Sequence, residues 1–233
     1  MDSPQVMLIT GTRKGIGEQL VKHYVTKGFS VVGCSRKDVD YKFDNYQHFC
    51  LDVSDELSVK KIFFEIKNSY GRLDYLINNA GIGLANHSLL TPGTSIHNIM
   101  NTNFLGTFLF CREGARLMKK NSFGRIVNLT TVAVPLKLEG EAIYSASKAA
   151  INSLTQILGK ELAEFGVTVN AVGPTPIKTD LIRSIPKEKI ENLINSLAIK
   201  RHGKVKDVIN VIDFFINPES DYVTGQVIYL GGV

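Results

Sequence analysis

Short apolar runs recur along the 233-residue chain, and segments with helical periodicity separate them. Most of the runs are apolar at consecutive positions, which is typical of strands that helices cover on both faces of a parallel sheet. The pattern predicts strands at 6–9, 29–33, 49–53, 75–77, 126–129, 167–171 and 227–230.

The intervals between these runs carry apolar residues at helical spacing, which indicates amphipathic helices. Ile16, Leu20 and Tyr24 mark the first helix. Further helices are expected at 55–70, 95–120, 142–165 and 205–216. Because strand and helix alternate throughout, the expected fold class is α/β, a single doubly wound parallel sheet of the Rossmann type with helices on both faces. No linker or repeat divides the chain, so residues 1–233 are expected to form one domain.

Composition is that of an ordinary globular protein, with 44% hydrophobic and 21% charged residues. The formal net charge is +5, which favours an anionic ligand or a nucleic acid as partner, or reflects only a solvated basic surface. The chain has no basic stripe with interleaved aromatic residues, so we do not expect nucleic-acid binding.

The three cysteines, Cys34, Cys50 and Cys111, are widely spaced and form no C-x-x-C motif. Neither a disulfide framework nor a metal site is expected from them, and a reducing compartment fits. Cys34 and Cys50 lie in apolar stretches and are expected to pack as small hydrophobic residues. No apolar run reaches the roughly 18–20 residues of a membrane span, and the polar start is no secretory signal, so we expect a cytoplasmic protein.

A glycine-rich turn follows the first expected strand and opens the first helix. Glycine permits a tight turn and a close approach of the backbone to an anion, and the helix N-terminus offers N–H groups to a pyrophosphate. The spacing is G-x-x-x-G-x-G and not G-x-G-x-x-G, which leaves a ligand-free tight turn as the alternative. The residues expected to contact a dinucleotide here are Gly11, Thr12, Arg13, Lys14, Gly15, Ile16 and Gly17.

The end of the second expected strand indicates which dinucleotide binds. An NAD site typically carries an acidic residue here for the ribose 2′-hydroxyl. This chain has Ser35 and Arg36 instead, and Lys14 could reach the same corner. Cations without a carboxylate suit a 2′-phosphate, which favours NADP(H) over NAD(H). The alternative is that Arg36 and Lys37 are plain surface charges.

Tyr144 and Lys148 stand four residues apart, so they share one face of a helix. A free tyrosine has a pKa of about 10, which makes it a poor acid or base near neutrality. A neighbouring ammonium group would lower the pKa of Tyr144 toward the range that general acid–base catalysis needs. A surface helical pair is the alternative reading of this spacing taken alone.

Over essentially its full length the chain resembles the short-chain dehydrogenase/reductase family, and most broadly its 3-oxoacyl-carrier-protein reductases. The matching motifs, in order, are Thr10-Gly11-x-x-x-Gly15-Ile16-Gly17, Asp52-Val53, Asn78-Asn79-Ala80-Gly81, Asn103-x-x-Gly106, Tyr144-x-x-x-Lys148 and Val169-Asn170-x-Val172-x-Pro174. Each motif is weak alone, but six in this order are specific.

The resemblance implies a catalytic role for four residues. Tyr144 is expected to be the acid in reduction and the base in oxidation. Lys148 is expected to bind the nicotinamide ribose and to lower the pKa of Tyr144. Thr131 replaces the family's usual serine and is expected to hydrogen-bond the substrate oxygen. Asn103 is expected to hold a water that links Lys148 to solvent. Because asparagine disfavours a helix interior, its position within the helix expected at 95–120 indicates a local kink or a function.

The resemblance also implies further cofactor contacts. Asp52 and Val53 are expected to cradle the adenine. Those expected along the adenine ribose and the nicotinamide half are Asn79, Ala80, Gly81, Tyr144, Lys148, Pro174, Ile177 and Thr179. Two departures from the family stand out: Thr175 replaces a glycine, and the short polar segment 37–48 is expected to lack the family's helix.

Residues of about 179–203 are expected to form a helical lid with an apolar underside over the substrate. The implied reaction is NADP(H)-dependent reduction of a ketone, a 3-oxoacyl or related carbonyl that could be thioester-linked, to a secondary alcohol. The alternatives are a reductase of a specialised sugar or secondary-metabolite pathway, and a catalytically idle NADP-binding protein on the same fold. A homodimer or homotetramer that pairs through the long helices is expected.

Overall fold

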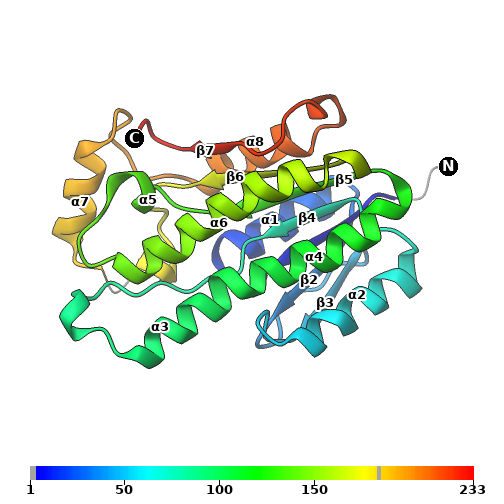
Figure 1. Cartoon of the computed structure of the whole chain (residues 1–233), viewed down its shortest axis with the longest axis horizontal. Helices are drawn as coiled ribbons and strands as arrows, with labels where there is room; N and C mark the ends of the chain where they lie inside the picture. Colours follow the sequence, from blue (N-terminus) through cyan, green and yellow to red (C-terminus); the bar gives the residue numbers. More distant parts are fainter. Residues whose placement is uncertain (1–3, 183–184) are drawn as a thin grey trace.

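The computed structural model describes residues 4–182 and 185–233. A seven-stranded parallel sheet forms its centre, in the order β3-β2-β1-β4-β5-β6-β7 (Figure 1). The strands are β1 Val6–Thr10, β2 Ser30–Ser35, β3 Tyr46–Cys50, β4 Tyr75–Asn78, β5 Gly124–Leu129, β6 Val167–Gly173 and β7 Val227–Tyr229. The order confirms the predicted doubly wound sheet, in which the chain reverses direction across the sheet between β1 and β4.

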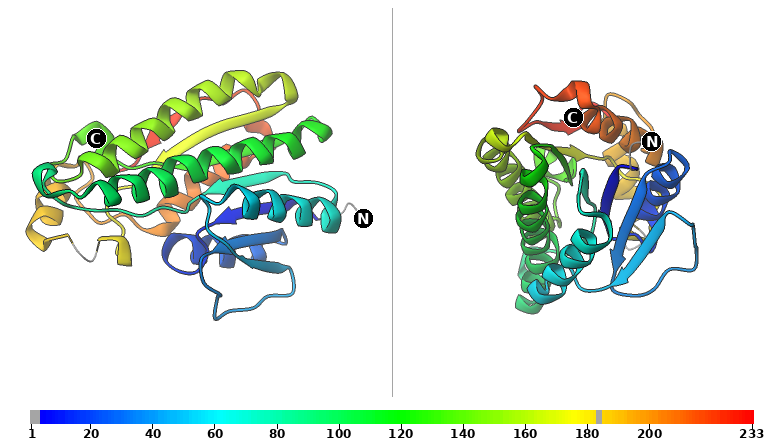
Figure 2. Two further views of the ribbon diagram at one scale, coloured as in Figure 1. Left: turned by 60° about the horizontal axis from the view of Figure 1, so that its bottom comes forward. Right: turned by 90° about the vertical axis from the view of Figure 1, so that its right-hand side faces the viewer.

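Helices cover both faces of this sheet, as the apolar runs predicted (Figure 2). The α-helices are α1 Gly15–Thr26, α2 Glu56–Tyr70, α3 Gly93–Met100, α4 Gly106–Met118, α5 Ala133–Leu136, α6 Ala142–Glu161, α7 Lys187–Ser196 and α8 Val205–Ile216. On one face α2, α4 and α6 bury residues such as Ile62, Phe110 and Leu154 against the sheet. On the other face α1 and α8 bury Leu20 and Phe215. Burying both faces explains why the central strands are apolar at consecutive positions.

The third strand differs from its prediction. It was expected at 49–53 but runs from Tyr46 to Cys50, because β3 is an edge strand whose side chains are only partly buried. Edge strands lack the continuous apolar signal of central strands. The apolar signal at 49–53 combines the last two residues of β3 with Leu51 and Val53 in the turn that follows. The expectation that Cys50 packs inside is also wrong, since Cys50 is exposed, whereas Cys34 is buried as expected.

The long helix expected at 95–120 is interrupted. A π-helical segment, Asn101–Leu105, separates α3 from α4 and has Asn103 at its centre. This confirms the local irregularity that asparagine predicted, and π-helical turns often occur at functional sites. The segment 37–45 contains no helix, also as expected.

The expected lid, residues of about 179–203, contains the short helix α7, which lies at the end of the molecule where the strands have their carboxyl ends (Figure 1). Part of the expected lid, residues 183–184, falls outside the described residues. In the part of the chain that the structure describes, no helix has both the length and the apolar character needed to cross a bilayer.

Candidate cofactor and catalytic site

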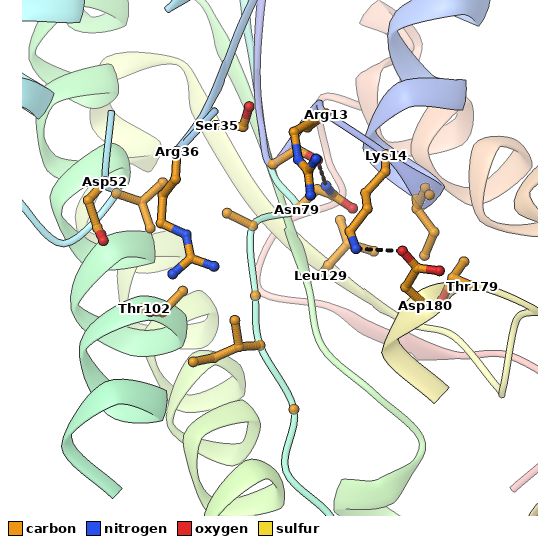
Figure 3. A pocket seen from close by; sticks show the side chains of 18 of the residues that line it. Arg13, Lys14, Ser35, Arg36, Asp52, Asn79, Thr102, Leu129, Thr179 and Asp180 are labelled. Carbon is orange, nitrogen blue, oxygen red and sulfur yellow. Dashed lines mark hydrogen bonds and ion pairs between the residues drawn. The ribbon is translucent and has the colours of Figure 1, made fainter. Parts of the chain in front are cut away.

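A cavity of about 780 Å³ opens where β1, β2, β4 and β5 end (Figure 3). In open α/β sheets ligands bind at this edge, next to the point where the strand order reverses. The residues expected from the sequence that line it are Gly11, Arg13, Lys14, Gly15, Ile16, Ser35, Arg36, Asp52, Val53, Asn79, Ala80, Gly81, Tyr144, Lys148, Pro174 and Thr179. The tertiary structure therefore brings both ends of the expected site into one space.

The glycine-rich turn is closely packed against the end of β4. Gly11 and Gly15 adopt φ of +72° and +66°, a backbone region that side chains disfavour. A Cβ atom at Gly17 would lie 2.2 Å from the backbone oxygen of Gly11, so this position admits only glycine without movement. The Asn79 side chain donates hydrogen bonds to the backbone oxygens of Thr10 and Gly11, at 2.8 and 3.1 Å. Asn79 thus holds the turn open toward the cavity.

Thr12 and Gly17 do not line the cavity. Thr12 is fully buried, and its backbone oxygen accepts a hydrogen bond from the Tyr41 hydroxyl at 2.6 Å. Both residues shape the turn from behind.

Lys14 and Arg36, the two cations expected at the same corner of the cavity, lie apart. Arg36 follows Ser35 directly after the end of β2, and its side chain extends into the cavity (Figure 3). Lys14 lies across the cavity and forms an ion pair with Asp180, the residue after Thr179. The expectation that Lys14 and Arg36 share one corner is therefore not met in this structure, and Arg36 is the cation nearest Ser35 along the chain.

Lys148 is buried at the inner end of the cavity. Its Nζ atom donates a hydrogen bond to the backbone oxygen of Leu129 at 2.7 Å, and burial lowers its pKa to about 8. A lowered pKa is the response of any ammonium group that is removed from water.

Tyr144 behaves differently from the sequence expectation. Burial and the charge of Glu141 together raise its pKa to about 12, against the opposing effect of a hydrogen bond with the Thr131 side chain. The expected lowering of the Tyr144 pKa by Lys148 is not seen in this structure, in which the Lys148 ammonium is bonded to Leu129. Desolvation of the phenol is the largest cause of the raised pKa.

Thr131 and Asn103 support the cavity without lining it. The Thr131 hydroxyl accepts a hydrogen bond from the Ala133 backbone at 3.2 Å. The Asn103 side chain is buried, donates to the Ile82 backbone oxygen and to the Ser147 hydroxyl, and accepts from the Ile82 N–H. A Cβ atom at Gly81 would lie 3.3 Å from Asn103 Oδ1 and 3.4 Å from Lys148 Nζ, so Gly81 passes close to both side chains.

The segment after β6 completes the cavity wall. Pro174 and Thr179 line it, but Ile177 is buried and packs with the core under α8. Thr175, which replaces the family's glycine, is buried and has no positive φ. Its backbone therefore does not require the freedom of glycine, and this departure carries no strain.

Several lining residues were not expected from the sequence. They are Lys37, Leu51, Ile82, Gly83, Thr102, Leu129, Thr130 and Asp180. Most of them directly continue a motif or follow a strand end, so the rule that ligands bind at carboxyl strand ends could have found them. Glu141 also escaped notice: it precedes α6, and burial raises its pKa to about 7 while Lys189 opposes this shift.

One cluster outside the cavity has the residue types of a metal site. Asp38, His48 and Cys50 place possible ligand atoms within 4.8 Å of one another. Both ring nitrogens of His48 already have hydrogen-bond partners inside the protein, Tyr46 on Nδ1 and Ser35 on Nε2. We therefore assign no metal to this cluster.

Comparisons with known proteins agree with this geometry. A family model described as "Enoyl-(Acyl carrier protein) reductase" matches residues 11–232. The 3-oxoacyl-[acyl-carrier-protein] reductase of Haemophilus influenzae is 30% identical over 98% of this chain and 97% of its own length. The enzyme of the same name from Vibrio cholerae is also 30% identical, over 98% and 96%. A solved structure described as ElxO with NADP bound has a TM-score of 0.90 and 30% identity, over 98% of this chain and 97% of its own.

The chain belongs to the short-chain dehydrogenase/reductase family. It is an NAD(P)-dependent oxidoreductase that acts on carbonyl or hydroxyl groups.

Proposed function

We propose that the protein uses NADPH to reduce a ketone to a secondary alcohol, and that a 3-oxoacyl group on a thioester is the first candidate substrate. The observation that carries this proposal is one cavity that holds Ser35 and Arg36 at one end and Tyr144 and Lys148 at the other. The names of the curated relatives, which are 3-oxoacyl reductases, support the substrate class.

The residues present fit the 2′-phosphate form of the cofactor. Arg36 reaches into the cavity beside Ser35, and neither residue is an acid that would repel a phosphate. Two structures of the neighbour ElxO are described with NADP and with NADPH bound, which supports the same choice. We propose that Gly11, Gly15 and the start of α1 receive the pyrophosphate.

The cofactor and the residues of the site together supply the hydride and the proton that reduction of a ketone needs. When bound, NADPH supplies a hydride to the carbonyl carbon. In our proposal Tyr144 then delivers its hydroxyl proton to the carbonyl oxygen, so that the ketone becomes an alcohol. In this proposal Lys148 holds the nicotinamide ribose, and its ammonium favours the phenolate that remains only after it leaves the Leu129 backbone oxygen. We propose that Thr131, which bonds the Tyr144 side chain behind the wall of the ligand-free cavity, orients the substrate oxygen through its hydroxyl when the substrate is bound. Asn103 fixes the backbone at Ile82, beside Gly81, which passes close to Lys148.

One observation favours a second candidate, a protein that binds NADP(H) without turnover. The pKa of Tyr144 is raised to about 12, which makes it a weak proton donor unless the bound cofactor changes its surroundings.

We further propose that residues 1–233 form one domain with a lid at about 179–203, that the protein works in the cytoplasm, and that it forms a homodimer or homotetramer. Helix α6 exposes the small residues Ala146 and Ala149 and leaves Ile157 51% exposed. A second copy of the chain could pack closely on this face, because small residues let helices approach.

The test is cofactor oxidation followed at 340 nm, with NADPH and NADH in turn. Substrates would include an acetoacetyl thioester, an enoyl thioester, a cyclic diketone, a keto-sugar and an aromatic ketone. Turnover of the acetoacetyl thioester with NADPH supports the proposal, and turnover of another ketone alone supports a specialised reductase. Tight NADPH binding with no turnover across the panel supports the idle binder.

A further inference from the structure

A chain of hydrogen bonds runs behind the Ser35–Arg36 corner of the cavity. The Ser35 hydroxyl lies 3.1 Å from His48 Nε2, and the Tyr46 hydroxyl lies 2.9 Å from His48 Nδ1. The Tyr46 hydroxyl in turn donates to the Thr12 hydroxyl at 3.0 Å. His48 is half-buried and does not line the cavity, but it touches Ser35, which does.

Two features of the fold make room for this chain of hydrogen bonds. A Cβ atom at Gly33 would lie 2.2 Å from the Tyr46 hydroxyl oxygen, so glycine on β2 lets Tyr46 approach from β3. The helix-free segment 37–45 also supplies Tyr41, whose hydroxyl bonds the backbone oxygen of Thr12. His48 is therefore connected both to the glycine-rich turn and to the end of β2.

The hydrogen-bond partners of His48 can pair with its ring in both the neutral and the protonated form. The Ser35 hydroxyl donates to the Lys37 backbone oxygen at 2.6 Å, so the His48 Nε2–H donates to the Ser35 oxygen at 3.1 Å or to the Lys37 oxygen at 3.3 Å. In the neutral ring, Nδ1 accepts from Tyr46. In the protonated ring, Nδ1–H donates to the Tyr46 oxygen, Tyr46 donates to Thr12, and Thr12 donates to the Cys34 backbone oxygen at 3.4 Å. Rotation of hydroxyl groups alone accommodates the extra proton.

The groups around His48 shift its pKa in opposite directions, so a bound anion can change whether the ring is protonated. Burial lowers the pKa of His48, while the Lys37 backbone oxygen and the Asp38 carboxylate raise it. A carboxylate oxygen of Asp38, after β2, and the Sγ atom of Cys50, on β3, lie within 4.8 Å of a ring nitrogen of His48. Arg36 and Lys37 follow Ser35 directly, after the end of β2. Burial raises the pKa of Tyr41 and of Tyr46, so both stay neutral phenols at physiological pH. A dianionic phosphate beside Ser35 would add negative charge and favour the protonated ring.

We propose that His48 is a specificity-determining positioning residue for the cofactor: it holds the Ser35 oxygen while the Ser35 hydroxyl turns from the Lys37 backbone oxygen to the 2′-phosphate of NADPH, and when protonated it adds a positive charge. This inference rests on the proposed use of NADPH. It adds that the preference for NADPH over NADH depends on pH through the protonation of His48, because only NADPH carries the 2′-phosphate.

The first experiment measures the Kd of NADPH and of NADH from pH 5.5 to 8.5 for the wild type, for His48→Asn and for His97→Asn, a matched control at an exposed position on α3. The 2′-phosphate itself titrates near pH 6 in every variant, so the comparison between variants isolates the histidine. The advantage of wild type over His48→Asn in NADPH affinity should grow by roughly three- to tenfold between pH 8 and pH 6, in the range of a partly screened charge pair. NADH affinity should show no such growth.

Two outcomes separate a failure of this inference from a failure of the proposed cofactor, and NADH affinity provides the control for folding. If wild type and His48→Asn keep a constant NADPH affinity ratio at all pH values, the inference about His48 is wrong although NADPH use stands. If the wild type binds NADH as tightly as NADPH throughout, the proposed cofactor itself is wrong. Equal NADH affinity in both proteins would show that His48→Asn leaves the fold intact.

A second measurement needs no variant. The ring protons of His48 are titrated by NMR in wild-type protein saturated with 2′,5′-ADP and, separately, with 5′-AMP. The proposal expects a higher pKa of His48 with 2′,5′-ADP, because only this ligand carries the 2′-phosphate. Equal titration midpoints with the two ligands would overturn it.

Discussion

The ammonium group of Lys148 lies 2.7 Å from the backbone oxygen of Leu129, and this hydrogen bond ties α6 to the carboxyl end of β5. Leu129 and Lys148 both line the cavity. The bond fixes the Lys148 side chain before any ligand arrives, so the ligand does not have to order it. The cost is a buried cation, which gives the first prediction.

Lys148→Met should stabilise the ligand-free protein at pH 7 by about 1–2 kcal/mol, because an apolar side chain replaces a buried charge. Burial lowers the pKa of Lys148 from 10.5 to about 8. Between these values the unfolded chain binds more protons than the folded one, so the penalty in the wild type fades as the pH rises. The gain should be full below pH 8 and should shrink toward pH 10.5.

Urea unfolding of wild type and Lys148→Met at pH 7 and pH 10 measures this gain. Lys160→Met, at an exposed position on the same helix, is the control and should change stability by less than about 0.5 kcal/mol at either pH. A gain that is the same at both pH values would contradict the assigned pKa.

Tyr144→Phe should lower kcat by at least about 100-fold, because the hydroxyl that donates the proton is lost. NADPH binding should change little, since the hydroxyl bonds Thr131 and lies away from the phosphate end of the cavity. Steady-state kinetics and NADPH fluorescence titration check both statements. Tyr222→Phe, at a fully exposed position, serves as the control. Retained turnover in Tyr144→Phe would refute the proposed proton donor.

Glu141→Gln should move the alkaline limb of the kcat profile for ketone reduction to lower pH. The charge of Glu141 raises the pKa of Tyr144, and the substitution removes that charge while keeping the size of the side chain. Because the pKa of Glu141 itself is about 7, the wild-type effect operates mainly above this pH. Glu139→Gln, nearby but exposed, is the control. Superimposable profiles for wild type and Glu141→Gln would show that Glu141 does not act on Tyr144.

Arg36→Glu should weaken NADPH binding by more than tenfold and leave NADH binding unchanged or improved. The substitution replaces a cation beside Ser35 with an anion that repels a 2′-phosphate. Lys61→Glu, an exposed position on α2, makes the same change in net charge elsewhere and should leave both affinities intact. An unchanged NADPH affinity in Arg36→Glu would rule out the assigned phosphate corner.

Gly17→Ala should lower the melting temperature and weaken binding of either cofactor. Its Cβ would lie 2.2 Å from the Gly11 backbone oxygen and 2.6 Å from the Asn79 side chain, so the turn has to shift. Such overpacking costs about 1–3 kcal/mol. Gly93→Ala at the start of α3 is the control, because its Cβ meets nothing within 4 Å, and it should be neutral or slightly stabilising. Calorimetry with and without NADPH distinguishes the two variants.

The sequence by itself determined the sheet and most of the cavity lining. Val6–Thr10 is buried at every position, and such continuous apolar runs mark central parallel strands without reference to the rest of the chain. The glycine-rich turn after β1 and the Ser35–Arg36 pair after β2 needed only chain order, because carboxyl ends of parallel strands meet at one edge of the sheet. The Asn79-Ala80-Gly81 contacts after β4 came from the family resemblance. Asn103 likewise revealed the irregular helix through its own backbone chemistry.

Only the tertiary structure decided the partners and the electrostatics. Lys14 and Asp180 are 166 positions apart, and no local pattern predicts that they form an ion pair. The direction of the Tyr144 pKa shift depends on how much water the folded chain removes, which residue spacing does not encode. The contact between His48 and Ser35 exists because β3 pairs beside β2 across a segment without a helix. Local sequence encodes period and burial, whereas charge partners and desolvation arise only when distant segments pack together.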